Sequence, residues 1–111
     1  MEIRHRNNKS RKICECESTA QKELGKDGAK NLRARLADLK AVERVSDLKK
    51  GNPHPLKGNR EGQFALRIVG GKRLVFSPDH GVQEPRSVDG SIDWQRVTSI
   101  LIEEIGDYHS G

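Results

Sequence analysis

The stretch "QFALRIVGGKRLVF", residues 63–76, decides the fold, because its apolar residues alternate with the period of a β-strand on both sides of a glycine pair. A two-residue turn at the glycines would pair Ile68 with Arg73 and place a charge among apolar side chains. A three-residue loop over 70–72 instead pairs Val69 with Arg73 and keeps the apolar side chains together. We therefore predict a hairpin with the three-residue loop. Its apolar face carries Phe64, Leu66, Ile68, Leu74 and Phe76, and its opposite face carries Arg67 and Arg73.

Upstream of the hairpin the apolar period becomes that of a helix. Apolar residues recur at helical spacing from Lys9 to Leu24, and Gly25 is a natural helix stop. A second apolar stripe predicts a helix over about 28–43, and "GKDG" would join the two helices as an antiparallel pair. The segment "SDLKKGNP" then predicts one last turn, capped by Ser46 and ended by Gly51 and Pro53.

Further strands are expected at both ends of the chain. "MEIR" can form a short first strand, and "VTSILIEEI", residues 97–105, is rich in β-branched residues. Residues 77–94 between the strands are turn-rich and acidic. We expect an α+β fold, in which a two-helix hairpin packs on one face of a small antiparallel β-sheet, as a single domain over 1–111. The other sheet face is then open.

The charge is distributed unevenly along the chain. Residues 1–76 hold 19 Lys and Arg against 9 Asp and Glu, and residues 77–111 hold 2 against 7, which gives net charges of +10 and −5. A basic body favours a polyanionic partner, first of all nucleic acid. The alternative on charge alone is a soluble basic protein with no such partner.

Cys14 and Cys16 are two positions apart in a helical stretch and so point to different sides of it. This spacing suits neither a disulfide nor a shared zinc site, and we expect reduced thiols in the cytoplasm. "MEIRHRNNKS" lacks the apolar core of a signal peptide, and we find no apolar run long enough to span a membrane. No cofactor and no metal are expected.

Two segments carry groups suited to phosphate chemistry. In "HPLKGNREGQF", residues 54–64, Lys57 and Arg60 together with Arg73 are positioned to surround one phosphate, although a solvated surface loop also fits this pattern. Near the end of the chain, "DYH", residues 107–109, directly follows a buried-type strand. Metal-free cleavage of RNA needs a base, an acid and cations, and the candidates are His54, Lys57, Arg73, Tyr108 and His109.

These segments resemble the HigB-type toxins, the plasmid-maintenance killer proteins of the RelE/ParE superfamily. The resemblance is carried by "HPLKGNREGQFALRI", "KRLVF" and "VTSILIEEIGDYH", and it extends over most of the chain. It implies a toxin that enters the ribosomal A site and cleaves mRNA without a metal. It also implies a HigA-like helix-turn-helix antitoxin as partner, with operator DNA contacted only through that antitoxin, and no membrane association. The long acidic loop at 78–93 departs from the family pattern.

The resemblance assigns catalytic roles to His54, Lys57, Arg73, Asp107, Tyr108 and His109. Arg60 and Arg67 are added as RNA-binding residues because of their charge and their position on the strand. Two rival functions stay open: a gyrase-poisoning ParE-like toxin, which would need neither His54 nor the "DYH" end, and a non-catalytic ribosome- or RNA-binding protein.

Overall fold

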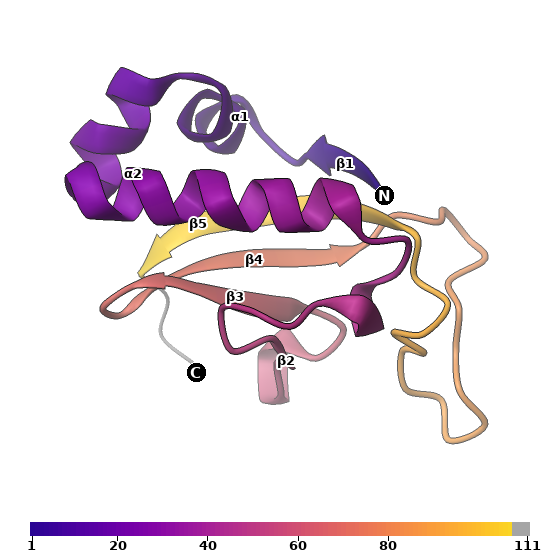
Figure 1. Cartoon of the computed structure of the whole chain (residues 1–111). Coiled ribbons are helices and arrows are strands. Elements are labelled where there is room, and N and C mark those ends of the chain that lie inside the picture. Colours follow the sequence, from indigo (N-terminus) through magenta and orange to yellow (C-terminus); the bar gives the residue numbers. More distant parts are fainter. Residues whose placement is uncertain (108–111) are drawn as a thin grey trace.

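A five-stranded sheet and a layer of helices on one of its faces make up the structure, a computed structural model that describes residues 1–107 (Figure 1). The strands lie in the order β1-β5-β4-β3-β2. Strand β1 runs parallel to β5, and the other neighbours are antiparallel. The predicted α+β fold is confirmed, with a sheet that is mixed instead of purely antiparallel. The elements are β1 (Glu2–His5), α1 (Asn8–Glu15), α2 (Glu17–Ala41), β2 (His54–Pro55), β3 (Phe64–Val69), β4 (Lys72–Pro78) and β5 (Ser99–Asp107).

The β3–β4 hairpin has a different register from the predicted one. Val69 pairs with Lys72 across a two-residue glycine turn, and the register then shifts so that Arg67 pairs with Arg73. The predicted three-residue loop, with Val69 opposite Arg73, is therefore wrong. A plain two-residue turn would have placed Arg73 opposite Ile68, on the apolar face. The bulge at Ile68 places Arg73 opposite Arg67 instead, so the apolar side chains stay on one face. The faces agree with the prediction: all five apolar residues belong to the core, and Arg67 is exposed.

The helical layer is also divided differently. The predicted helix from Lys9 to Leu24 is interrupted at Cys16, whose extended backbone ends α1 and begins α2. Gly25 has a φ of 78° and a non-helical backbone, so the predicted helix stop at Gly25 is confirmed. A second helix resumes at once, so the join is a kink at one residue and not the four-residue linker "GKDG". Only glycine adopts such a conformation at little cost, which explains a kink at this position. The later turn is a 3-10 helix, η1 (Val45–Asp47), which contains Ser46 instead of being capped by it.

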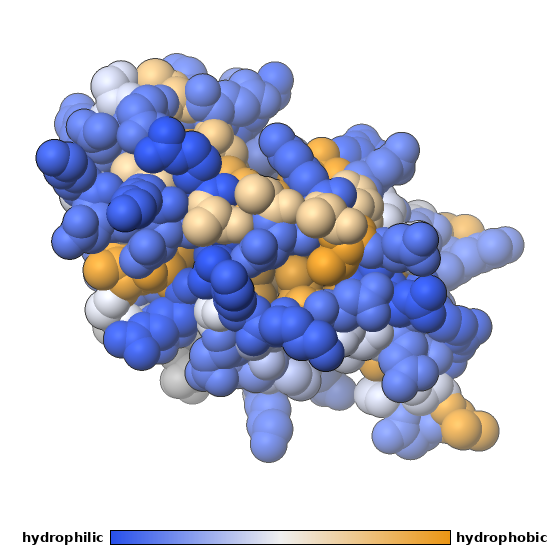
Figure 2. Space-filling view, in the orientation of Figure 1, coloured by the Kyte–Doolittle hydropathy of each residue, from blue (hydrophilic) through white to orange (hydrophobic). Residues whose placement is uncertain are grey.

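The core lies between α2 and the sheet. Leu32 and Leu39 on α2 are buried against strand residues that include Leu66, Phe76 and Ile102. Figure 2 shows apolar side chains gathered between this helix and the sheet, within a surface that is otherwise mostly hydrophilic. Burial of each such side chain contributes roughly 1.5–3 kcal/mol, so this packing holds the helices on one face of the sheet. Neither α1 nor α2 covers the opposite face (Figure 1).

The segment between β4 and β5 is a long loop held by its own contacts. Arg86 and Ile92 form an isolated antiparallel bridge, and the Asp93 amide donates to the Pro85 carbonyl at 2.9 Å. The Ser46 amide donates to the Trp94 carbonyl at 3.2 Å, which ties the loop to η1. These contacts give the loop a defined conformation, and it lies across a cavity from Pro55 of the edge strand β2. Figure 1 shows the loop between the ends of β4 and β5. Within residues 1–107, no helix has both the length and the apolarity needed to cross a bilayer.

Candidate functional site

The sheet face turned away from the helices brings His54 into line with a carboxylate. His54 pairs with Ala65 on β3, Ala65 with Val75 on β4, and Val75 with Glu104 on β5. Directly opposed residues in an antiparallel sheet project from the same face. His54 and Glu104 therefore stand on the same face, which we call the open face because no α-helix covers it. Ala65 and Val75 between them are fully buried, so longer side chains cover this row.

A hydrogen bond fixes the tautomer of His54. Its Nδ1 lies 2.7 Å from the carbonyl oxygen of Asn52. A carbonyl only accepts, so Nδ1 carries the hydrogen and donates it. In the neutral ring, Nε2 is then left with a lone pair. Asn52 itself has a φ of 49°, an uncommon conformation that turns its carbonyl toward the ring. The imidazole is thus oriented to accept a proton at Nε2.

Two arginines, Arg67 and Arg73, stand opposite each other on the same face, next to the Ala65–Val75 pair. Arg67 pairs with Arg73 across β3 and β4, and the Arg67 side chain has no hydrogen-bond or ion-pair partner among residues 1–107. The Arg73 guanidinium donates to the carbonyls of Gly70 at 2.9 Å and Lys72 at 3.2 Å. Like charges directly opposed in a sheet repel each other, and an anion bound beside them relieves that repulsion. This row is suited to hold a phosphate.

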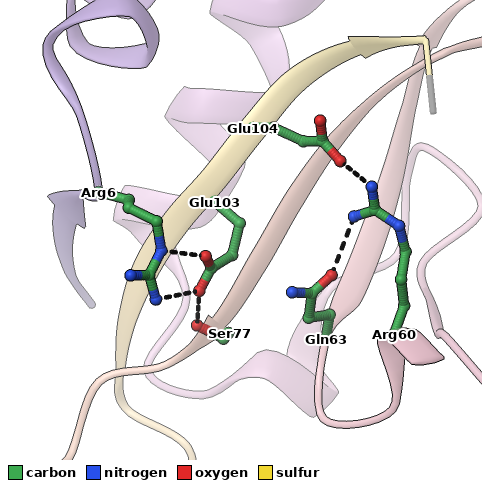
Figure 3. Close-up of polar contacts among 6 residues, drawn as sticks. All are labelled: Arg6, Arg60, Gln63, Ser77, Glu103 and Glu104. Atoms are coloured by element: carbon green, nitrogen blue, oxygen red, sulfur yellow. Dashed lines mark hydrogen bonds and ion pairs between the residues drawn. The ribbon is translucent and has the colours of Figure 1, made fainter.

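Two glutamates on the same face were missed by the sequence reasoning (Figure 3). Successive strand residues normally point to opposite faces, but the β4–β5 register shifts between Val75 and Phe76, and both Glu103 and Glu104 reach open-face partners. Glu104 forms an ion pair with Arg60. The consecutive pair "EE" inside a β-branched strand was the available signal.

Glu103 is held by two donors. It accepts from the guanidinium of Arg6 and, at 2.6 Å, from the hydroxyl of Ser77 (Figure 3). Partial burial acts to raise the pKa of Glu103, but the hydrogen bonds from Arg6 and Ser77 outweigh it, and the pKa lies below its ordinary value. Glu103 is therefore a carboxylate at neutral pH and neutralises Arg6.

Arg60 lies across the open face. Arg60 is the last residue of the 3-10 helix η2 (Gly58–Arg60). Its guanidinium donates to the Gln63 side chain at 3.1 Å and forms an ion pair with Glu104 on β5 (Figure 3). Lys57, by contrast, lines a cavity beside the long loop. The structure thus divides the predicted phosphate cluster: Arg60 and Arg73 belong to the open face, and Lys57 belongs to the cavity.

The C-terminal group of predicted site residues is only partly described. Asp107 ends β5 opposite Lys72, at the hairpin end of the sheet, and is exposed. Tyr108 and His109 lie outside the described residues. Among residues 1–107, no three His, Cys, Asp or Glu side chains come together in an arrangement that could hold a metal ion.

The fold is shared with bacterial toxins of known structure. The chain matches a YoeB/ParE toxin from Agrobacterium tumefaciens with a TM-score of 0.61 and 15% identity, covering 98% of this chain and 100% of that one. It matches YoeB from Staphylococcus aureus in a YoeB–YefM complex and as a YoeB dimer, with TM-scores of 0.58 and 0.57, 20% identity, and coverage of 98% of this chain and 97% of theirs. No protein-family model and no curated protein sequence matches the chain. At these identities the likeness establishes a YoeB/ParE-like toxin fold.

Proposed function

We propose that this protein is the toxin of a toxin–antitoxin pair in the RelE/ParE superfamily, of the HigB type, and that it cleaves mRNA in the ribosomal A site. The observation that carries the proposal is the open sheet face, where His54 presents an Nε2 with no partner among residues 1–107, one row from the opposed Arg67 and Arg73. The shared fold of the YoeB and YoeB/ParE toxins supports the same assignment.

The proposed reaction uses groups of the chain alone. His54 or His109 takes the proton of a 2′-hydroxyl, and the 2′-oxygen attacks the adjacent phosphorus. Arg73 stabilises the charge on the phosphorane, and the bond to the 5′-oxygen breaks as that oxygen gains a proton from the second histidine or Tyr108. Lys57 lines the cavity and is left out of this step. The products are a 2′,3′-cyclic phosphate and a free 5′-hydroxyl. Asp107, the last residue of β5, is proposed to orient the neighbouring Tyr108 and His109.

The proposed partners are a HigA-like helix-turn-helix antitoxin and the ribosome with its mRNA. One matched structure is a YoeB–YefM complex, which gives a precedent for a toxin of this fold held by a second protein. A neighbouring gene for a small helix-turn-helix protein would support the pairing. An isolated gene whose overexpression leaves growth unchanged would contradict it.

The test compares cleavage of one message with and without ribosomes at matched salt, followed by analysis of the new ends. We expect efficient cleavage only on translating ribosomes, with 5′-hydroxyl ends. His54→Gln should lower the rate by about 100-fold or more if His54 is the base or acid, and exposed Glu23→Gln, which removes no positive charge, should not. New 5′-phosphate ends would contradict this chemistry. Gyrase-dependent DNA cleavage, or ribosome binding with no cutting, would favour one of the two rival functions.

A further inference from the structure

The long loop and the segment after β2 enclose a cavity of about 660 Å³. One wall includes Leu56, Lys57 and Glu61, and the other includes Arg86, Ile92 and Trp94. The volume lies within the range of about 300–1,000 Å³ that is usual for small-molecule sites. The second wall belongs to the loop that departs from the family pattern, so the cavity is a feature of this chain.

Trp94 is a fixed aromatic surface in this cavity. Its ring centroid lies 4.8 Å from that of Phe64, tilted by 58°, and 6.4 Å from that of Phe76, edge-on at 86°. Its carbonyl accepts the Ser46 amide at 3.2 Å. The residue is half-buried, so one part of the indole packs on the core and another part lines the cavity. A ring held in this way loses little freedom when a flat ligand stacks on it.

The polar groups of the cavity include a cation with no internal partner. The Lys57 side chain is exposed and makes no hydrogen bond or ion pair within residues 1–107, and its backbone carbonyl accepts the Arg60 amide at 3.2 Å. Arg86 is already engaged, by Glu84 at 2.7 Å and by the Gly90 carbonyl at 2.8 Å. The cavity therefore keeps one ammonium for an anion, and the carboxylate of Glu61 can accept from an amino group.

We propose that this cavity binds one nucleotide of single-stranded RNA, an inference that rests on the proposed function. The base stacks on Trp94 against the apolar side chains of Leu56 and Ile92, and a flanking phosphate lies at Lys57. Glu61 accepts a hydrogen bond from an exocyclic amino group, so adenine, cytosine and guanine are preferred to uracil. The free ammonium of Lys57 at the cavity and the net charge of +5 on the chain favour RNA over an acidic peptide as the occupant.

The chain contains a single tryptophan, so tryptophan fluorescence reports on the surroundings of Trp94 alone. The probe is a 2′-O-methyl trinucleotide of adenine, which cannot be cut through a 2′-hydroxyl. We expect saturable quenching, with affinity about tenfold weaker for an abasic oligonucleotide of the same length. Uridine in place of adenine should also bind more weakly. Lys57→Gln should weaken binding and flatten its salt dependence, and Lys26→Gln on α2 should change neither.

Absence of saturable quenching, or equal affinity for the abasic oligonucleotide, would overturn the proposal. So would quenching by a protein antitoxin in the absence of any response to RNA. Ribosome-dependent cleavage, measured on the same preparation, separates this result from the proposed function. Cleavage without quenching refutes the cavity site alone, and quenching without cleavage refutes the nuclease alone.

Discussion

At the scale of single residues, the charge of Glu103 should make the stability of the protein depend on pH. Its pKa is lowered from the ordinary value of 4.5, so it stabilises the fold above that value and this contribution is lost as pH falls through the lower, folded pKa. Glu103→Gln should reduce the free energy of unfolding by about 1 kcal/mol at pH 7, because the Glu103 side chain is mostly buried while its partner Arg6 is exposed and screened by solvent. Urea unfolding at pH 7 and in acid measures this difference.

The difference should disappear in acid, where the wild-type carboxyl is protonated as well. Glu23→Gln, at an exposed position on α2, is the matched control and should leave the stability unchanged. A loss of equal size at both pH values would mean that Glu103 acts through packing and not through its charge.

How far the site could be predicted also depends on single residues. Strand alternation was enough to place Arg67 and Arg73 on one face. Glu104 was missed because its direction depends on a bulge between β4 and β5, and the pair "EE" in the strand was the only local signal of it that the sequence offered. The orientation of His54 depends on the positive φ of Asn52, and an asparagine in a loop gives only a weak signal for that conformation.

At the scale of elements, the kink in α2 gives a second prediction. Gly25 has a φ of 78°, and an added Cβ would meet no atom within 4 Å. The Cβ of Gly25→Ala therefore clashes with no other atom. The substitution destabilises the fold only because alanine disfavours this backbone conformation. We expect a loss of about 1–3 kcal/mol in the free energy of unfolding, measured with urea.

Lys26→Ala, one residue further on, is the control, because alanine suits the helix there. If Gly25→Ala were as stable as the wild type, the kink would not be required by the fold.

The element types were predictable and their joints were not. Apolar spacing identified the helices and the hairpin strands because burial against α2 and the sheet demands it. The break at Cys16 and the bulge at Ile68 each change the chain direction at one residue. The break and the bulge are stabilised by tertiary packing, so the local sequence does not indicate where they occur.

At the scale of the whole molecule, the basic helical surface is expected to hold the protein on ribosomal RNA. Arg33 and Lys40 are exposed on α2, and Arg33 has only a 3.4 Å pair with exposed Glu17. Reversing both charges to Glu should lower cleavage on ribosomes on the order of tenfold and weaken its salt dependence. The measurement is the initial cleavage rate over a series of salt concentrations.

The control is oligonucleotide binding by the same variant, which should stay as in the wild type because the cavity is untouched. Unchanged cleavage on ribosomes would place the docking surface elsewhere.

The pairing of the first and last strands has a consequence for the synthesis of the protein. Glu2 pairs with Ser99 and His5 with Ile102, and β5 lies between β1 and β4 in the sheet. A nascent chain emerges from its N-terminus, so β1 must wait for the strand that completes the sheet. Such non-local pairing makes folding slow. The open face on β3, β4 and β5 therefore forms only after β5 has left the ribosome that made it, and an incomplete chain does not assemble the site.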